Sequence, residues 1–188
     1  MDYLPDIEQC LQTLEAGGII LYPTDTIWGL GCDATNEKAV ERIFALKRRP
    51  EHKGMIVLVA DPGDILHYTS QSDPRILDYL QKAQKPTTVI YQGVVNLATN
   101  LSVDGTIAIR VVNDEFCKHL IKRLGRPIVS TSPNRSGDPP PLHFDSIGPD
   151  LRAGADYIVQ YRRSDNSSTE PSAVVYFNPD GSVRVIRP

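Results

Sequence analysis

The chain has 188 residues, 40% of them hydrophobic, and a formal net charge of −3. This length and composition predict one globular domain over residues 1–188. The slightly acidic balance argues against a protein that is basic all over and coats nucleic acid. No stretch approaches the roughly 20 apolar residues of a membrane span, and the N-terminus shows no signal peptide. We therefore expect a cytoplasmic protein.

The cysteines and histidines show no pattern typical of a metal site. Cys10, Cys32 and Cys117 are widely spaced, and the four histidines lack the spacing of metal ligands. We expect buried free thiols and no protein-ligated metal.

The first quarter of the chain predicts two helices around a short strand. Pro5–Ala16 carries an apolar face and is followed by Gly17, which can take the left-handed conformation that stops a helix. Ile19–Tyr22 is a β-branched apolar run, and we interpret the stretch after it, through Gly31, as a loop in which glycines allow close backbone approach. A second helix begins at about Asn36, capped by Thr35 or Asn36, and ends at three consecutive cations.

The middle and the end of the chain alternate between helices and strands. A helix opens at Asp73-Pro74, and another runs from an Asn113 cap to Leu124. Residues 133–141 are too rich in proline and glycine for regular structure. The turn at 178–181 joins the last two strands as a hairpin. The predicted strands are Met55–Ala60, Thr87–Tyr91, Thr106–Val112, Pro127–Ser132, Tyr157–Tyr161, Ser172–Phe177 and Val183–Ile186. This order predicts an α/β domain, α+β-like, with a twisted mixed sheet flanked by helices.

Two hydroxyl-rich loops follow predicted strands, at residues 23–26 and 130–137. In open α/β sheets, ligands gather beyond the carboxyl ends of the strands. Hydroxyls and loop amides can hold phosphate or carboxylate oxygens, although ordinary turn chemistry explains either loop taken alone.

A cluster of cations ends the second helix. Lys47, Arg48 and Arg49 stand before Pro50, and Lys53 extends the cluster. Cations at a helix C-terminus are favoured by its dipole, so a solvated cap is one interpretation. A triphosphate site is the other, because Arg binds phosphate bidentately and Lys supplies a point charge.

Arg110 lies late in an apolar strand. A buried charge there needs compensation, either by a carboxylate ligand or by an internal Asp or Glu. The chain has no G-x-x-x-x-G-K-[ST], G-x-G-x-x-G or G-x-S-x-G motif. Residue patterns alone therefore indicate an anion-binding α/β domain, and an enzyme.

Three stretches together resemble a known family. YPTDTIWGLG at 22–31, LKRRP at 46–50 and STSPNRSG at 130–137 are similar, in this order, to the motifs of the YrdC/Sua5 family, whose members are threonylcarbamoyl-AMP synthases. The resemblance covers about Gly17 to Pro188. The chain is similar to the short bacterial form, and we expect it to lack the extra C-terminal domain of the longer Sua5 form.

The resemblance implies a fold and a reaction. The fold is a twisted mixed sheet with helices around a large concave basic pocket. In the reaction, L-threonine and bicarbonate or CO2 give an N-carboxylated threonine that attacks the α-phosphate of ATP, which releases pyrophosphate. A threonylcarbamoyl transferase complex then modifies adenosine 37 of tRNA. Mg²⁺ is expected to travel with ATP on its phosphates.

The resemblance also implies roles for individual residues. Its catalytic positions are Lys47, Arg49, Ser132 and Asn134. The residues that match ATP-contacting positions are Lys47, Arg49, Lys53, Thr106, Ser130, Ser132, Asn134 and Arg187. The residues that match threonine-contacting positions are Thr24, Arg110 and Ser172.

Two other functions are possible for such a chain. The same concave surface could bind double-stranded RNA or tRNA without catalysis, although a net charge of −3 disfavours affinity built on phosphates alone. A carbamoyl-adenylate enzyme like the hydrogenase-maturation carbamoyltransferases shares this domain. Those are large chains with zinc fingers and an acylphosphatase-like segment, which this sequence lacks.

Overall fold

The computed structural model describes residues 3–50, 53–71, 73–165, 170–178 and 180–188. The helical elements are α1 (Leu4–Glu15), α2 (Glu37–Lys47), η1 (Pro62–His67), α3 (Pro74–Lys82), η2 (Thr99–Leu101), α4 (Glu115–Leu124), η3 (Phe144–Ser146) and α5 (Pro149–Ala153). The strands are β1 (Ile20–Tyr22), β2 (Gly29–Gly31), β3 (Ile56–Val59), β4 (Thr87–Gln92), β5 (Thr106–Val111), β6 (Ile128–Ser130), β7 (Tyr157–Ile158), β8 (Ala173–Phe177) and β9 (Val183–Arg187). The expected α/β class with a mixed sheet is confirmed.

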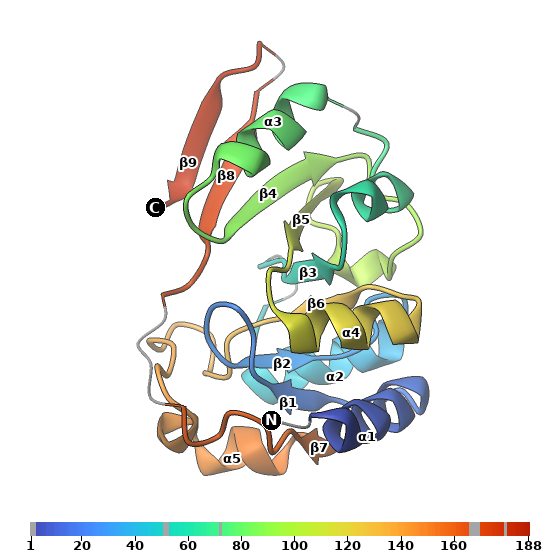
Figure 1. The fold of residues 1–188 in the computed structure, drawn as a ribbon, viewed down its shortest axis with the longest axis vertical. Coiled ribbons are helices and arrows are strands. Elements are labelled where there is room, and N and C mark those ends of the chain that lie inside the picture. The colour runs from blue at the N-terminus through green and yellow to red at the C-terminus, as the bar shows by residue number, and fades with distance from the viewer. Residues whose placement is uncertain (1–2, 51–52, 72, 166–169, 179) are drawn as a thin grey trace.

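The strands form two sheets, one above the other in Figure 1. The larger has the order β6-β3-β5-β4-β8-β9 and mixes parallel and antiparallel pairs. The smaller has the order β2-β1-β7. Two reciprocal backbone bonds join the sheets, from Leu30 N to Thr131 O at 2.8 Å and from Thr131 N to Leu30 O at 3.0 Å. The loops after β1 and β6 are thereby brought to the same place.

The strand β2 corrects our interpretation of residues 29–31 as loop. Its two glycines are needed because β2 lies directly against its neighbours. A Cβ on Gly31 would stand 2.6 Å from both the Val129 carbonyl oxygen and the Tyr22 ring, and one on Gly29 would stand 2.9 Å from the Ser130 hydroxyl. We correctly expected these glycines to allow close backbone approach. The residues that approach closely form a paired strand, however, and not a loop.

Other differences concern caps and short elements. The N-cap of α4 is Asp114 and not Asn113, because the Asp114 carboxylate accepts the Cys117 N–H at 2.9 Å. The cap of α2 is Asn36, as expected. The strand predicted over 157–161 is only two residues long, and η3 and α5 lie where we predicted no element. Of the hairpin turn, Pro179 lies outside the described residues.

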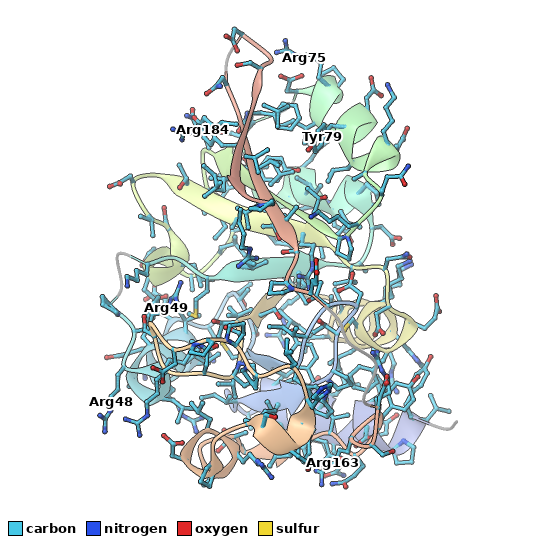
Figure 2. All side chains as sticks on the ribbon, turned by 90° about the vertical axis from the view of Figure 1, so that its left-hand side faces the viewer. Arg48, Arg49, Arg75, Tyr79, Arg163 and Arg184 are labelled. Carbon is cyan, nitrogen blue, oxygen red and sulfur yellow. The ribbon has the colours of Figure 1, made fainter. Side chains whose placement is uncertain are left out.

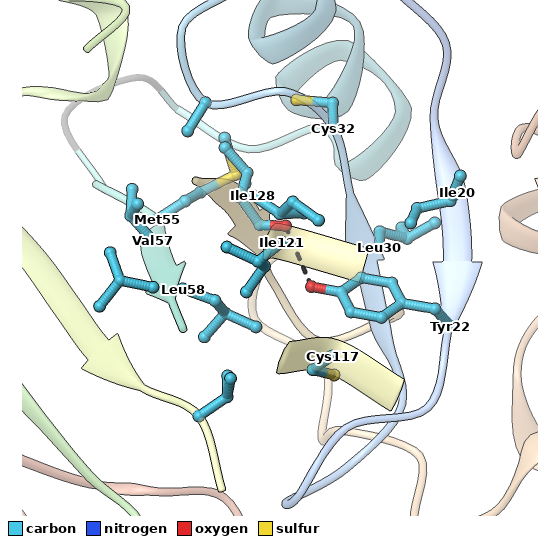
Figure 3. Packing of buried hydrophobic residues seen from close by; sticks show 14 of the residues in the cluster. Ile20, Tyr22, Leu30, Cys32, Met55, Val57, Leu58, Cys117, Ile121 and Ile128 are labelled. Atoms are coloured by element: carbon cyan, nitrogen blue, oxygen red, sulfur yellow. Dashed lines mark hydrogen bonds between the residues drawn. The ribbon is translucent and has the colours of Figure 1, made fainter. Parts of the chain in front are cut away.

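A continuous core fills the space between the sheets and helices (Figure 3). Tyr22 is fully buried there, and its hydroxyl donates to the Val129 carbonyl at 3.3 Å. The predicted free thiols are confirmed: Cys10, Cys32 and Cys117 are buried and unpaired. Burial raises the pKa of each thiol, so all three stay protonated at neutral pH.

We predict that Gly31→Ala destabilises the protein by about 1–3 kcal/mol, because the new methyl group meets backbone and a fixed ring. Gly63→Ala is the matched control, since a Cβ there meets nothing within 4 Å. Urea unfolding of both variants measures the difference. Equal midpoints would show that the β2–β6 contact can relax.

Candidate active site

A cavity of about 320 Å³ opens where the two sheets meet. The β1–β2 loop, the β3 entry, the loop after β6 and the end of β9 form its walls. Its lining residues are Thr26, Ile27, Trp28, Arg49, Gly54, Met55, Ile56, Arg110, Ser130, Thr131, Ser132, Asn134, Gly137, Asp138, Pro140, Pro171, Ser172 and Arg187.

The β1–β2 loop is held in shape by one buried hydroxyl. Thr24 Oγ1 donates to the Ile27 carbonyl at 2.7 Å and accepts the Thr26 N–H at 3.1 Å. This turn directs Thr26, Ile27 and Trp28 to the cavity wall. The rings of Trp28 and Phe144 pack there with their centroids 4.9 Å apart. Thr24 itself lies outside the cavity lining.

Lys47 lies beneath the loop that follows β6. Its side chain is almost fully buried, and Nζ donates to the carbonyl oxygens of Ser132 and, at 2.6 Å, Asn134. The Lys47 carbonyl in turn accepts the Ser136 N–H at 3.0 Å. Burial, and then the charge of Arg49, lowers the pKa of Lys47 to about 7. Lys47 therefore shapes the cavity without lining it.

Asn134 tightens the same loop. Its Nδ2 donates to the carbonyls of Arg135 at 2.9 Å and Asp138 at 2.7 Å. The other end of the amide, Oδ1, is buried with no hydrogen-bond partner in the described part of the chain. Asn134 therefore offers an acceptor at the cavity wall while its donors close the loop.

The end of α2 separates two neighbouring arginines. Arg48 adopts the left-handed conformation with φ of 48°, and the Arg49 N–H turns back to the Phe44 carbonyl at 2.9 Å. Arg48 is exposed at the outer margin of the molecule, whereas Arg49 lies inward at the cavity (Figure 2). Arg49 donates to the carbonyls of Lys53 at 2.6 Å and Gly54 at 2.7 Å. These bonds leave N–H donors of the guanidinium for an anion.

The compensation of Arg110 is internal. Its Nη2 lies 3.1 Å from Asp25 Oδ1, and both side chains are less than a tenth exposed. Its Nε is buried without a partner among the described residues. Close by in the cavity wall, Arg187 Nε donates to the Ser172 carbonyl at 3.0 Å, and the Ser172 hydroxyl bonds Thr88 Oγ1 at 2.8 Å.

Positive charge dominates this cavity. Arg49, Arg110 and Arg187 line it, and Lys47 lies below its floor. Burial lowers the pKa of Arg187, and the charge of Arg110 lowers it further. Asp138 is the one carboxylate among the lining residues that the structure describes, and Asp25 is paired with Arg110. The chemistry of the cavity suits anionic ligands.

The structure brings most of the predicted site residues to this one cavity. Those that line it are Arg49, Arg110, Ser130, Ser132, Asn134, Ser172 and Arg187. Those outside its lining are Thr24, Lys47, Lys53 and Thr106. The Thr106 hydroxyl donates to the Val103 carbonyl at 2.7 Å, and the Lys53 side chain is exposed.

Sequence reasoning missed several wall residues. Thr26 lies within the 23–26 loop that we singled out but was not named as a site residue, and Ile27 and Trp28 follow that loop directly. For Ile27 and Trp28, an apolar pair just before a glycine was the available signal. The partnership of Asp25 with Arg110 spans 85 positions, and no local pattern points to it.

The described residues contain no group of three or more His, Cys, Asp or Glu side chains placed to hold a metal ion. In the same part of the chain, every helix is too short or too polar to cross a membrane.

Comparison with known proteins identifies the family. The family model Sua5_yciO_yrdC, described as "Telomere recombination", matches residues 12–188, so the chain belongs to the Sua5/YciO/YrdC family. This confirms the resemblance drawn from the three sequence motifs.

Among the relatives, the threonylcarbamoyl-AMP synthase of Saccharophagus degradans is 38% identical over 140 residues, which cover 71% of each chain. That of Pseudoalteromonas translucida is 32% identical over 181 residues, 89% of this chain and 91% of its own. The structure of P. abyssi Sua5 complexed with L-threonine shares the fold, with a TM-score of 0.84 and 24% identity over 97% of this chain and 53% of its own.

The depressed pKa of Lys47 predicts a pH-dependent stability. As the pH rises from about 7 towards 10, native Lys47 loses its proton while unfolded Lys47 keeps it. The unfolded state then binds more protons, so the free energy of unfolding rises with pH, by up to about 1.4 kcal/mol per pH unit.

Urea unfolding from pH 6 to 9 measures this dependence. The rise should disappear in Lys47→Met and persist in Lys53→Met, whose exposed side chain is the control. Parallel curves for Lys47→Met and the wild type would contradict the assignment.

Proposed function

We propose that this chain is an ATP-dependent threonylcarbamoyl-AMP synthase, an enzyme of the nucleotidyltransferase class. One observation carries the proposal: a single cavity gathers three arginines with the hydroxyl and amide groups of the loop after β6. Such a cavity suits a triphosphate next to a carboxylate. The relatives named threonylcarbamoyl-AMP synthase, at 32–38% identity, support the same reaction.

The reaction joins three substrates. The amino group of L-threonine takes up bicarbonate or CO2 to form a carbamate, with loss of water when bicarbonate is the source. A carbamate oxygen then forms a bond to the α-phosphorus of ATP, and the bond from that phosphorus to the bridging oxygen breaks. Threonylcarbamoyl-AMP remains and pyrophosphate leaves. No protein nucleophile is needed, so positioning and electrostatic stabilisation supply the rate.

We assign the phosphates to the Arg49 side of the cavity. Arg49 keeps N–H donors beyond its two backbone bonds, and Ser130 and Ser132 present hydroxyls from the end of β6. Lys47 holds the Ser132 and Asn134 carbonyls from below the cavity floor. Lys53 and Thr106 stand outside the lining and would contact the nucleotide only at its edge. Arg187 lies where the two sides meet: we assign it to the nucleotide, and its bonds to Ser172 keep its charge next to the threonine side.

We assign threonine to the Arg110 side. The unpartnered Nε of Arg110 is a donor for a carboxylate, and Ser172 adds a hydroxyl next to it. Thr24 contributes by holding the β1–β2 loop in place. Complexed L-threonine in the P. abyssi protein is consistent with an amino-acid site in this fold.

The proposed reaction also implies partners for this protein. Threonylcarbamoyl-AMP is an activated carbamate, and we propose that a tRNA-modifying transferase complex consumes it in the cytoplasm. ATP enters as its Mg²⁺ complex, with the ion held mainly by the phosphates.

Two alternatives differ in their chemistry. An RNA-binding module would use the positive cavity without turnover, and a carbamoyl-phosphate-dependent enzyme would form a carbamoyl adenylate. The carbonyl-anchored loop and the buried Arg110–Asp25 pair favour a small-molecule site over a surface for a duplex.

Pyrophosphate release distinguishes the three functions. The protein is incubated with ATP, Mg²⁺, bicarbonate and L-threonine. Release that requires threonine supports the proposal, and release driven by carbamoyl phosphate supports the carbamoyl enzyme. No release, together with salt-sensitive RNA binding, would identify the binding module.

Arg49→Ala should lower the rate of threonine-dependent pyrophosphate release by about 100-fold or more, because it removes charge stabilisation from the displacement. The adjacent Arg48→Ala should stay near the wild-type rate, since Arg48 is exposed and outside the cavity lining. Circular dichroism of both variants controls for folding. Comparable rates for the two would refute the assignment of Arg49.

A further inference from the structure

Asp25 is a buried carboxylate that our assignment of roles leaves without a function. One oxygen, Oδ1, accepts from Arg110 Nη2 at 3.1 Å, and the other, Oδ2, accepts the Asn113 N–H at 3.0 Å. The Asp25 side chain is 7% exposed. Asp25 is therefore anchored to the backbone on one side and to the guanidinium on the other.

This pairing leaves part of the guanidinium unsatisfied. A guanidinium carries five N–H donors in a rigid plane, so fixing one of them orients the others. Nε of Arg110 is buried without a partner in the described part of the chain, and Arg110 lines the cavity. A buried donor left unpaired costs free energy, and an acceptor on a ligand would recover it.

The charges around Arg110 favour a ligand with a single negative charge. Arg110 and Arg187 interact closely enough for one to lower the pKa of the other, and Asp25 neutralises one of the two. One positive charge then remains uncompensated at this side of the cavity. The carboxylate of an amino acid carries the single negative charge that matches it.

We propose that Asp25 is a positioning residue that orients Arg110 for the carboxylate of the amino-acid substrate. The inference rests on the proposed function, because that function supplies an amino acid as ligand. Asp25 acts through Arg110, so it determines how well the site recognises a carboxylate.

The chain offers a matched control in Asp33. Asp33 is also buried, lies 2.7 Å from an arginine, Arg126, and accepts a backbone N–H from Thr35 at 2.8 Å. Its side chain is outside the cavity lining. Asp33→Asn therefore removes an equivalent buried carboxylate that does not line the proposed ligand site.

The test compares two ligands by calorimetry in the absence of ATP: L-threonine, and L-threoninamide, which lacks the carboxylate charge. Asp25→Asn should weaken L-threonine binding by about 10-fold to 100-fold, with a smaller effect on the amide. Asp25→Glu keeps the charge but displaces it by a methylene group, so it should reduce the preference for L-threonine less. Asp33→Asn should keep the wild-type preference.

A double-mutant cycle shows whether Asp25 acts through Arg110. In an Arg110→Met background, Asp25→Asn should have no further effect on L-threonine affinity. Wild-type preference in folded Asp25→Asn, or in Asp25→Glu if the former does not fold, would overturn the inference. If the wild-type protein itself binds no L-threonine and releases no pyrophosphate, that result refutes the proposed function, and with it the inference that rests on it.

Discussion

The site depends on the buried side chain of Lys47. It lies at the last residue of α2 and holds two carbonyl oxygens of a loop that begins more than 80 residues later. Among the described residues, the other polar contact between this loop and α2 is the bond from the Ser136 N–H to the Lys47 carbonyl. One side chain thus determines how the hydroxyls of that loop stand relative to Arg49.

Burying a cation costs free energy, and the structure offsets this cost differently for each cation of the site. Lys47 Nζ donates to two backbone carbonyls, and burial lowers the pKa of Lys47 to about 7. Arg110 is neutralised by Asp25, and Arg49 and Arg187 bond backbone carbonyls. Since carbonyls satisfy donors without cancelling charge, an excess of positive charge remains. That excess is stabilised when an anionic substrate binds, so stability and function compete here.

Much of the fold could be predicted from local patterns. The β-branched runs at β3 and β5 and the caps of α2 and α4 are visible in the sequence, although the α4 cap was misplaced by one residue. The strand β2 could not be recognised, because Gly-Leu-Gly has little strand propensity and forms a strand only against β1 and β6. The site residues were recognised through family motifs, and the internal partner of Arg110 remained open because it depends on tertiary packing.

The central claim is that ATP and L-threonine bind side by side in the cavity between the two sheets. A crystal structure with L-threonine and a non-hydrolysable ATP analogue tests it most directly. We expect the triphosphate against Arg49 and Ser132, and the threonine carboxylate within hydrogen-bond distance of Arg110 Nε. A nucleotide bound elsewhere on the molecule, or a threonine carboxylate away from Arg110, would contradict the account.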